Sequence, residues 1–186
     1  MLRIIGGSLK GRQIKAPEGS GTRPTSSKVR EAVFDILAFR ISGARFLDLY
    51  AGSGAMGIEA LSRGASFAFF VESHHEAVAL LRDNLARLGL ERSSQILQMP
   101  AEKALGKIGE MAMGFDIVFM DPPYREKQWE KLLTKLSDAG ILERDASIVL
   151  EHGTRTKPVL PDRLREIKSY RYGDSSLLLA GKAGEP

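Results

Sequence analysis

Cysteine is absent from this sequence of 186 residues, and its absence excludes several kinds of chemistry. Without a thiol the chain can form no disulfide and no zinc–thiolate site, and it cannot use a cysteine nucleophile. This suits a reducing cytoplasm. Long apolar runs are absent too: none approaches the length of a membrane span, and residues 1–6 become polar too soon for a signal peptide. The three histidines lack the spacing of metal ligands, so we expect no metal and no membrane.

The residues that are present indicate one folded domain with a basic excess. Hydrophobic residues make up 43% and charged residues 27%, which argues against a disordered chain. The length fits a single domain over residues 1–186. The formal net charge is +4, and the basic excess is concentrated in the first forty residues, which favours a polyanionic partner. Those forty residues hold Arg3, Lys10, Arg12, Lys15, Arg23, Lys28, Arg30 and Arg40 against Glu18, Glu31 and Asp35.

The N-terminal segment has a pattern of its own. Residues 2–16 alternate loosely around glycines and predict a short β-hairpin, and a loop rich in Gly, Ser and Pro follows up to Thr25. We therefore divide the chain into a basic hairpin-and-loop extension, residues 1–25, and a core, residues 26–182. The core opens with a helix that Ser26 and Ser27 can cap, with Val29, Val33, Ile36 and Leu37 on one face.

From residue 45 the sequence alternates between apolar strands and amphipathic helices. Such alternation is typical of an α/β fold with a Rossmann-like, mostly parallel sheet covered by helices on both faces. Gly173-Asp174 is a hairpin turn signal, so we expect the sheet to finish with an antiparallel C-terminal hairpin. The predicted strands are Phe46–Tyr50, Phe67–Glu72, Gln95–Gln98, Phe115–Met120, Ser147–His152, Glu166–Tyr172 and Ser175–Ala180, and the helices are Ala55–Arg63, Glu76–Leu88, Ala101–Ile108 and Lys127–Leu136.

A glycine-rich turn joins the first of these strands to its helix. Residues 46–57 read FLDLYAGSGAMG, so Gly52, Gly54 and Gly57 form the pattern G-x-G-x-x-G. Glycines let the backbone approach a ligand closely, and the helix N-terminus offers unpaired N–H groups. Glu72 ends the next strand, where a carboxylate can accept both ribose hydroxyls of a nucleoside.

The same fingerprint is typical of dinucleotide sites, so NAD is an alternative cofactor. Two features speak against NAD. Asp48 lies inside the first strand, where it can accept N–H bonds from a ligand or from the turn, and we expect no second domain that would hold a hydride-transfer substrate.

The strand that ends at Met120 runs into the sequence Asp121-Pro122-Pro123-Tyr124. Proline has no N–H group to donate, so the strand ladder must stop there. The stretch is either a plain strand-ending turn or a rigid clamp for a flat group that carries N–H donors. Ligands of open α/β sheets sit at the carboxyl ends of the strands. Asp48, Glu72 and Asp121 all lie at such ends, so the glycine turn and this stretch should form one site.

Together the two motifs resemble a class I S-adenosylmethionine-dependent methyltransferase that acts on an exocyclic amino group. Further motifs narrow the resemblance to the RsmD family, whose members methylate guanine N2 in bacterial 16S ribosomal RNA. The resemblance covers nearly the whole chain and is weakest after about residue 153. The narrowing motifs are Arg3-Ile4-Ile5-Gly6-Gly7, Gly11-Arg12, Arg23-Pro24-Thr25, Val29-Arg30-Glu31 and residues 46–61.

The resemblance implies a cofactor, a partner and a set of site residues. The cofactor is S-adenosyl-L-methionine, and the substrate is a guanine 966-type site of 16S ribosomal RNA, which a monomer would methylate in an assembled or assembling small subunit. The catalytic residues would be Asp121 and Pro122, which accept hydrogen bonds from the amino group, Pro123, which keeps them rigid, and Tyr124, which stacks on the base. Cofactor contacts are expected from Asp48, Tyr50, Ala51, Gly52, Ser53, Gly54, Gly57, Glu72, Ala101, Glu102 and Asp121, and RNA contacts from Arg3, Lys10, Arg12, Arg23, Thr25, Arg30 and Arg125.

One position departs from the family pattern. Members commonly carry Asp-Ala or Asn-Ala after the third strand, with the acid or amide facing the adenine amino group, whereas this chain has Met99-Pro100-Ala101-Glu102. The adenine contact would then come from Glu102 or from the backbone. Two other functions stay open: an adenine-N6 methyltransferase on DNA or RNA, which shares the Asp-Pro-Pro-Tyr motif, and a non-catalytic RNA-binding ribosome-assembly factor.

Overall fold

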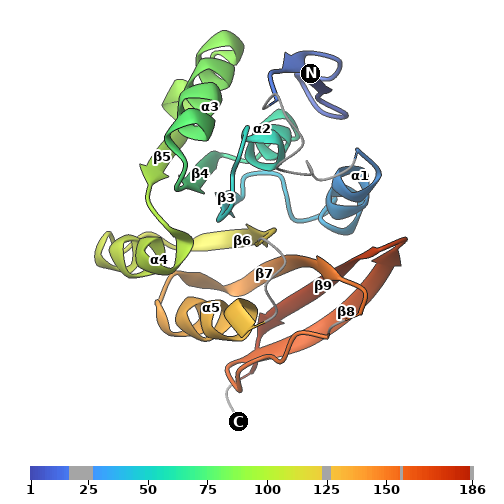
Figure 1. The fold of residues 1–186 in the computed structure, drawn as a ribbon, viewed down its shortest axis with the longest axis vertical. Coiled ribbons are helices and arrows are strands. Elements are labelled where there is room, and N and C mark those ends of the chain that lie inside the picture. Colours follow the sequence, from blue (N-terminus) through green and yellow to red (C-terminus); the bar gives the residue numbers. More distant parts are fainter. Residues whose placement is uncertain (17–26, 123–126, 156, 185–186) are drawn as a thin grey trace.

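The structure, a computed structural model, describes residues 1–16, 27–122, 127–155 and 157–184. Within these residues a seven-stranded sheet has the order β5-β4-β3-β6-β7-β9-β8 (Figure 1). The pairs from β5 to β7 are parallel, and β9 pairs antiparallel with both β7 and β8. The predicted mostly parallel sheet with an antiparallel C-terminal hairpin is confirmed. The strands are β3 Arg45–Asp48, β4 Phe67–Glu72, β5 Ser94–Gln98, β6 Phe115–Met120, β7 Leu142–Gly153, β8 Leu164–Tyr172 and β9 Ser175–Lys182.

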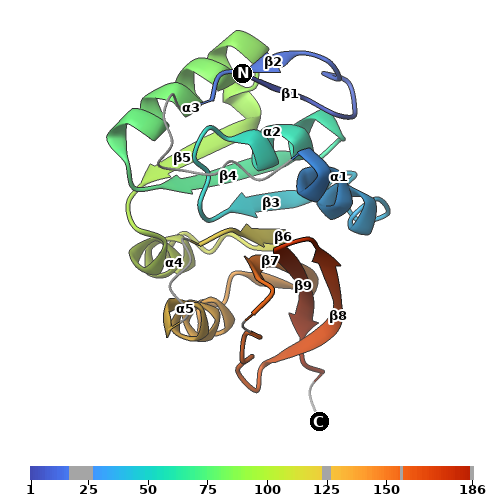
Figure 2. The same ribbon diagram turned by 45° about the vertical axis from the view of Figure 1, so that its right-hand side comes forward.

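Helices cover both faces of the sheet and divide the core into two clusters (Figure 2). Helices α1, α2 and α3 pack on one face around Phe46 and Phe70, and α4 and α5 pack on the other around Leu47 and Phe69. Neighbouring residues of one strand thus face opposite clusters. Strand β4 is buried on both faces, as its unbroken apolar sequence predicts. The helices are α1 Ser27–Ile36, α2 Ala55–Ser62, α3 His75–Leu88, α4 Ala101–Glu110 and α5 Lys127–Asp138, with a 3-10 turn η1 at Glu91–Ser93.

The N-terminal hairpin is short and is built into the core. Its strands β1, Leu2–Arg3, and β2, Gln13–Ile14, form an antiparallel pair, as predicted. Ile4 and Ile14 are buried in the cluster that also contains α1, α2 and α3. The hairpin therefore adds apolar contacts to the face of the sheet that α1, α2 and α3 cover, as well as basic side chains.

Strand β7 begins earlier than the sequence predicts. It starts at Leu142, not Ser147, because Phe115 of β6 pairs with Leu142. The next pair is Ile117 with Ser147, so the extra residues of this register shift lie in β7. The charged residues of this early part made it look like a loop. Two of them are held by partners: Glu143 forms an ion pair with Arg45 at 2.5 Å, and the Asp145 carbonyl accepts a hydrogen bond from Arg40.

Candidate functional site

Three acidic residues come together at the carboxyl edge of the sheet. Asp48 ends β3, Glu72 ends β4, and Asp121 follows the last residue of β6. Strand β3 lies between the other two, and Asp48 is level with Phe70 of β4 and Phe119 of β6. The parallel topology thus places all three at one edge, as the sequence predicts.

The three glycines of the turn do different things. Gly52 has φ +52°, and a side chain placed there would meet no atom within 4 Å, so this position faces open space. At Gly54 a Cβ would collide with Leu81, and at Gly57 with the ring of Phe70, so these two glycines permit close packing of α2 against α3 and β4. Gly52 is therefore the glycine at which a ligand can approach the backbone.

Asp48 is a buried carboxyl beside the glycine turn. Its Oδ2 accepts a hydrogen bond from the Gly57 amide at 3.3 Å, and its Oδ1 has no hydrogen-bond partner in the described part of the chain. Burial raises the pKa of Asp48 to about 7; the backbone N–H groups of Gly57 and Tyr50 oppose this rise, and the charge of Glu72 adds to it. A cation or N–H donor bound at this edge would stabilise the charged form of Asp48.

Glu72 is held in its charged form by backbone N–H groups. Burial alone would raise its pKa, but hydrogen bonds from His74, Gly52 and Ser73 lower the pKa below the ordinary value. The Gly52 amide donates to Glu72 Oε2 at 2.9 Å, and the amides of Ser73 and His74 donate to Oε1. This ionised carboxylate is hydrogen-bonded directly to the glycine turn, where it can accept hydrogen bonds from the hydroxyl groups of a ligand.

Helix α4 starts at the position that departs from the family pattern. Pro100 precedes its first turn, and the Pro100 carbonyl accepts hydrogen bonds from the amides of Lys103 and Ala104. The amides of Ala101 and Glu102 have no partner among the described residues. The Glu102 carboxylate lies 3.6 Å from Lys135 Nζ, and burial, with the charge of Glu102, raises the pKa of Tyr50 to about 12. The start of α4 thus presents backbone amides to this edge of the sheet, while the Glu102 side chain faces Lys135.

Only part of the Asp-Pro-Pro-Tyr stretch lies within the described residues. Asp121 is half-buried and Pro122 is buried, directly after β6. Pro123, Tyr124 and Arg125, together with Arg23 and Thr25 of the predicted RNA contacts, lie outside the described residues. Their predicted roles stay predictions.

Arg30 is not available to contact RNA, so this part of the prediction is wrong. Its side chain is 1% exposed on the inner face of α1. The guanidinium donates a hydrogen bond to the Arg3 carbonyl at 2.6 Å and lies 3.8 Å from the Glu59 carboxylate. Burial lowers the pKa of Arg30 despite that carboxylate. Arg3, Lys10 and Arg12 are exposed on the hairpin, where they can reach a polyanion.

Two buried polar residues that the sequence analysis missed attach the hairpin to the site. Glu59 of α2 is fully buried, and its carboxylate accepts hydrogen bonds from the amides of Ile5 and Gly6 at 2.8 and 2.7 Å. Asn84 of α3 is 1% exposed. Its side chain accepts a hydrogen bond from the Lys15 amide and donates hydrogen bonds to the carbonyls of Lys15 and Ser53. A polar residue on an otherwise apolar helix face was the available signal in both cases.

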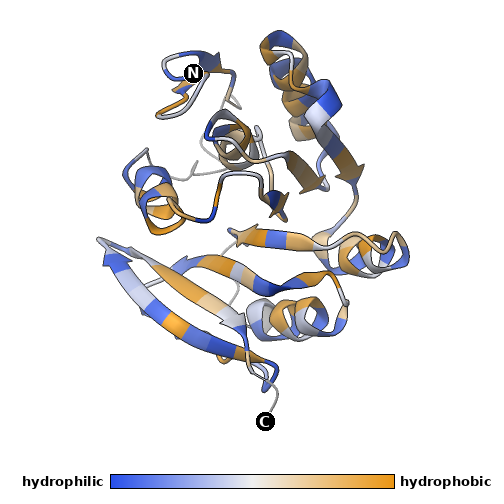
Figure 3. Ribbon diagram, turned by 180° about the vertical axis from the view of Figure 1, so that it is seen from behind, coloured by the Kyte–Doolittle hydropathy of each residue, from blue (hydrophilic) through white to orange (hydrophobic). Residues whose placement is uncertain are grey.

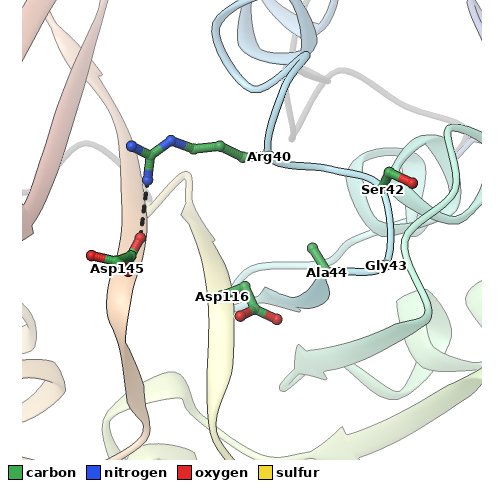
Figure 4. Close-up of a pocket in the computed structure, with 6 residues that line it drawn as sticks. All are labelled: Arg40, Ser42, Gly43, Ala44, Asp116 and Asp145. Carbon is green, nitrogen blue, oxygen red and sulfur yellow. Dashed lines mark hydrogen bonds between the residues drawn. The ribbon is translucent and has the colours of Figure 1, made fainter.

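A separate hollow of about 320 Å³ lies at the opposite, amino edge of the sheet (Figure 4). Two of its lining residues already bond within the protein: the Asp116 carboxylate accepts a hydrogen bond from the Arg45 amide, and Arg40 donates a hydrogen bond to the Asp145 carbonyl. The hollow is remote from the glycine turn and takes no part in the site. Its lining residues are Arg40, Ser42, Gly43, Ala44, Asp116 and Asp145.

Comparison with known proteins identifies the family. The family model described as "Conserved hypothetical protein 95" matches residues 2–181. The chain belongs to this family. It is 38% identical over 150 residues to the Escherichia coli protein "Ribosomal RNA small subunit methyltransferase D". This alignment covers 81% of this chain and 74% of the relative. The resemblance to the RsmD family is therefore confirmed.

Two further relatives extend the match to the whole chain. The Bacillus subtilis protein "Putative rRNA methyltransferase YlbH" is 39% identical over 186 residues, 98% of this chain and 100% of that protein. The solved structure "Putative methyltransferase yhhF from Escherichia coli" superposes with a TM-score of 0.88 at 34% identity and covers 99% of each chain. The Rossmann-like methyltransferase fold is thus confirmed. Among the described residues, no helix could span a membrane and no cluster of potential metal ligands occurs.

Proposed function

We propose that this chain transfers a methyl group from S-adenosylmethionine to the exocyclic N2 amino group of a guanine in 16S ribosomal RNA. The observation that carries the proposal is the meeting of Asp48, Glu72 and Asp121 at one edge, beside the glycine turn. The names of the relatives, which are small-subunit ribosomal RNA methyltransferases, support the substrate class.

The residues at this edge fit S-adenosylmethionine. The Glu72 carboxylate would accept the ribose hydroxyls, Gly52 leaves open space at the turn, and the first amides of α4 would meet the adenine ring. The buried Asp48 carboxylate, with its unsatisfied Oδ1, would favour the positive charges of the cofactor. The cofactor supplies the electrophilic methyl group.

Asp121 and Pro122 would hold the amino group that attacks. The lone pair of guanine N2 is delocalised into the ring, so the nitrogen is a poor nucleophile. The two N–H groups would donate to the Asp121 carboxylate and to the Pro122 carbonyl, which favours a pyramidal nitrogen with its lone pair toward the methyl group. Transfer leaves a cationic amine, whose proton passes to Asp121 or to water. We expect Pro123 to keep these acceptors rigid and Tyr124 to stack on the extruded base.

The wider setting follows from this substrate. We infer that a monomer acts in the cytoplasm on RNA of an assembled or assembling small subunit, and that Arg3, Lys10 and Arg12 contact its phosphates. An adenine-N6 methyltransferase would use the same Asp-Pro-Pro-Tyr motif, and a non-catalytic assembly factor would use only the basic surface.

Nucleoside analysis of ribosomal RNA from cells that lack this protein distinguishes the three functions. Our proposal predicts the loss of one N2-methylguanosine from 16S RNA and its return when the wild-type gene is restored. Loss of N6-methyladenosine indicates the second function. An unchanged nucleoside profile with defective subunit assembly indicates the third.

A further inference from the structure

Strand β8 forms the outer edge of the sheet, and its last residues reach the carboxyl edge where Asp121 lies (Figure 2). The strand pairing shows which residue of β8 lies at the same height along the sheet as Asp121. Met120 pairs with Leu150, and Glu151, the next residue of β7, pairs with Leu177, which pairs with Tyr170. Asp121 and Tyr170 are therefore level and three strand spacings apart, roughly 15 Å. That is about the reach of two nucleotides of extended RNA.

Two tyrosines and a lysine alternate along this end of β8. Tyr170 packs against the cluster that contains α1, so it lies on the α1 face of the sheet. Lys168 Nζ lies 5.0 Å from the centre of the Tyr170 ring, and Tyr172 is 37% exposed. Because alternate residues of a strand share a face, Lys168, Tyr170 and Tyr172 form one row, which we name the tyrosine strip.

The surroundings of the tyrosine strip are basic. Residues 155–182 contain seven Lys or Arg and three Asp or Glu, and Figure 3 shows β8 as largely hydrophilic beside the more apolar β9. The Thr154 amide donates to the Asp174 carbonyl, which holds the exposed Arg155 near the hairpin turn. Charged residues on an edge strand discourage pairing with other sheets. That role does not account for the exposed ring of Tyr172 beside the partly buried Tyr170, close to the level of the candidate site.

We propose that the tyrosine strip and Arg155 bind single-stranded RNA next to the target guanine. The exposed Tyr172 ring would stack on a flanking base, Tyr170 would support the strip from the core side, and Lys168 and Arg155 would neutralise phosphates. The N-terminal hairpin and the C-terminal hairpin would then hold the RNA from two sides of the carboxyl edge. This inference rests on the proposed function, because it needs an RNA substrate at Asp121.

The test compares variants in steady-state methylation of 16S RNA with labelled S-adenosylmethionine. Tyr172→Ala should raise KM for RNA about tenfold and leave kcat nearly unchanged, because a flanking contact is made equally before and in the transition state. Tyr172→Phe keeps the ring and should behave as the wild type. Arg155→Glu should also raise KM and weaken the salt dependence of RNA binding.

Arg165→Glu is the matched control. Arg165 is exposed on the same strand, but it lies near the amino edge, roughly 20 Å from Tyr172. It should leave KM unchanged. Melting curves and the affinity for S-adenosylhomocysteine should not change in any of these variants.

The inference is overturned if Tyr172→Ala and Arg155→Glu methylate RNA with the wild-type KM, or if Arg165→Glu raises KM as much as Arg155→Glu does. Wild-type activity separates this failure from the failure of the proposed function. If the wild type methylates no RNA guanine, the proposed function itself fails.

Discussion

The Asp48 carboxyl occupies a position where ionisation is unfavourable until a positive group binds. Its folded pKa of about 7 lies above the ordinary value of 3.8. Between these two values the folded chain binds more protons than the unfolded chain, so the contribution of Asp48 to stability falls as the pH rises from about 4 to about 7. Above pH 7 the folded state carries the full penalty, which is at most roughly 4 kcal/mol.

Asp48→Asn should remove this penalty. We expect the variant to be more stable than the wild type at pH 8 by up to a few kcal/mol, and the difference should shrink as the pH falls toward 4. The same variant should bind S-adenosylmethionine more weakly at pH 8, because the carboxylate charge is lost. Urea unfolding at pH 5, 6, 7 and 8 measures the first effect. A stability difference that does not vary with pH would show that Asp48 does not titrate in this range.

Asn84 shows how a single residue joins two elements that are distant in sequence. Its amide group connects both backbone groups of Lys15 with the Ser53 carbonyl of the glycine turn. Asn84→Ala leaves these groups buried and unpaired, so we expect a loss of roughly 2–4 kcal/mol in stability and a lower cofactor affinity. Denaturant melts and calorimetry with S-adenosylhomocysteine measure both effects.

Asp83→Ala is the control for this change. Asp83 is the preceding residue and contacts the same Lys15, but through an exposed ion pair at 3.0 Å. Exposed pairs contribute roughly 0–1 kcal/mol, so this variant should remain close to the wild type in both measurements. Equal effects of the two substitutions would contradict the bridging role of Asn84.

At the scale of the element, the proposed RNA contacts of the N-terminal hairpin must be tested by substitution and not by deletion. Deletion would remove Ile4 and Ile14 from the core. Replacing Arg3, Lys10 and Arg12 together by Gln leaves Ile4 and Ile14 in the core and removes three exposed charges, although Arg3 and Arg12 lose hydrogen bonds to the Gly11 and Arg87 carbonyls. The slope of log binding constant against log salt should become shallower by about 0.7 for each single-strand phosphate that the hairpin no longer neutralises.

A second triple variant controls for net charge. Lys107, Arg144 and Arg165 are exposed toward the amino edge, at the end of α4 and near the starts of β7 and β8. Their replacement by Gln removes the same charge and should leave the slope almost unchanged. If both triple variants change the slope equally, the hairpin provides only general charge.

The sequence predicted most elements because the central strands carry unbroken apolar runs with glycine-rich or polar ends. Strand β4 and strand β6 have the predicted bounds, and the acids that follow the strands lie at one edge. The burial of Arg30 could not be predicted from such local patterns. Its burial depends on Glu59, which also accepts amides more than fifty positions away in the chain. Buried polar contacts of this kind depend on tertiary structure, which local pattern does not encode.

At the scale of the molecule, one sheet carries both halves of the proposed reaction. Strands β3 and β4 present the residues that we propose for the cofactor, and β6, the next neighbour of β3, presents Asp121. The placement of Asp121 beside the glycine turn leaves a site suited to a mononucleoside cofactor and a base. Calorimetry should therefore detect S-adenosylmethionine and S-adenosylhomocysteine but not NAD. Tight binding of NAD alone would contradict the cofactor assignment.

The most direct test of the account is single-turnover methylation of 16S ribosomal RNA with S-adenosylmethionine labelled in its methyl group, followed by digestion to nucleosides. The wild type should place the label in N2-methylguanosine. Asp121→Ala should fold and bind S-adenosylhomocysteine normally but react roughly a hundred- to a thousandfold more slowly, and Asp121→Asn should fall between the two. Label in N6-methyladenosine, or an Asp121→Ala variant that methylates at the wild-type rate, would contradict the account.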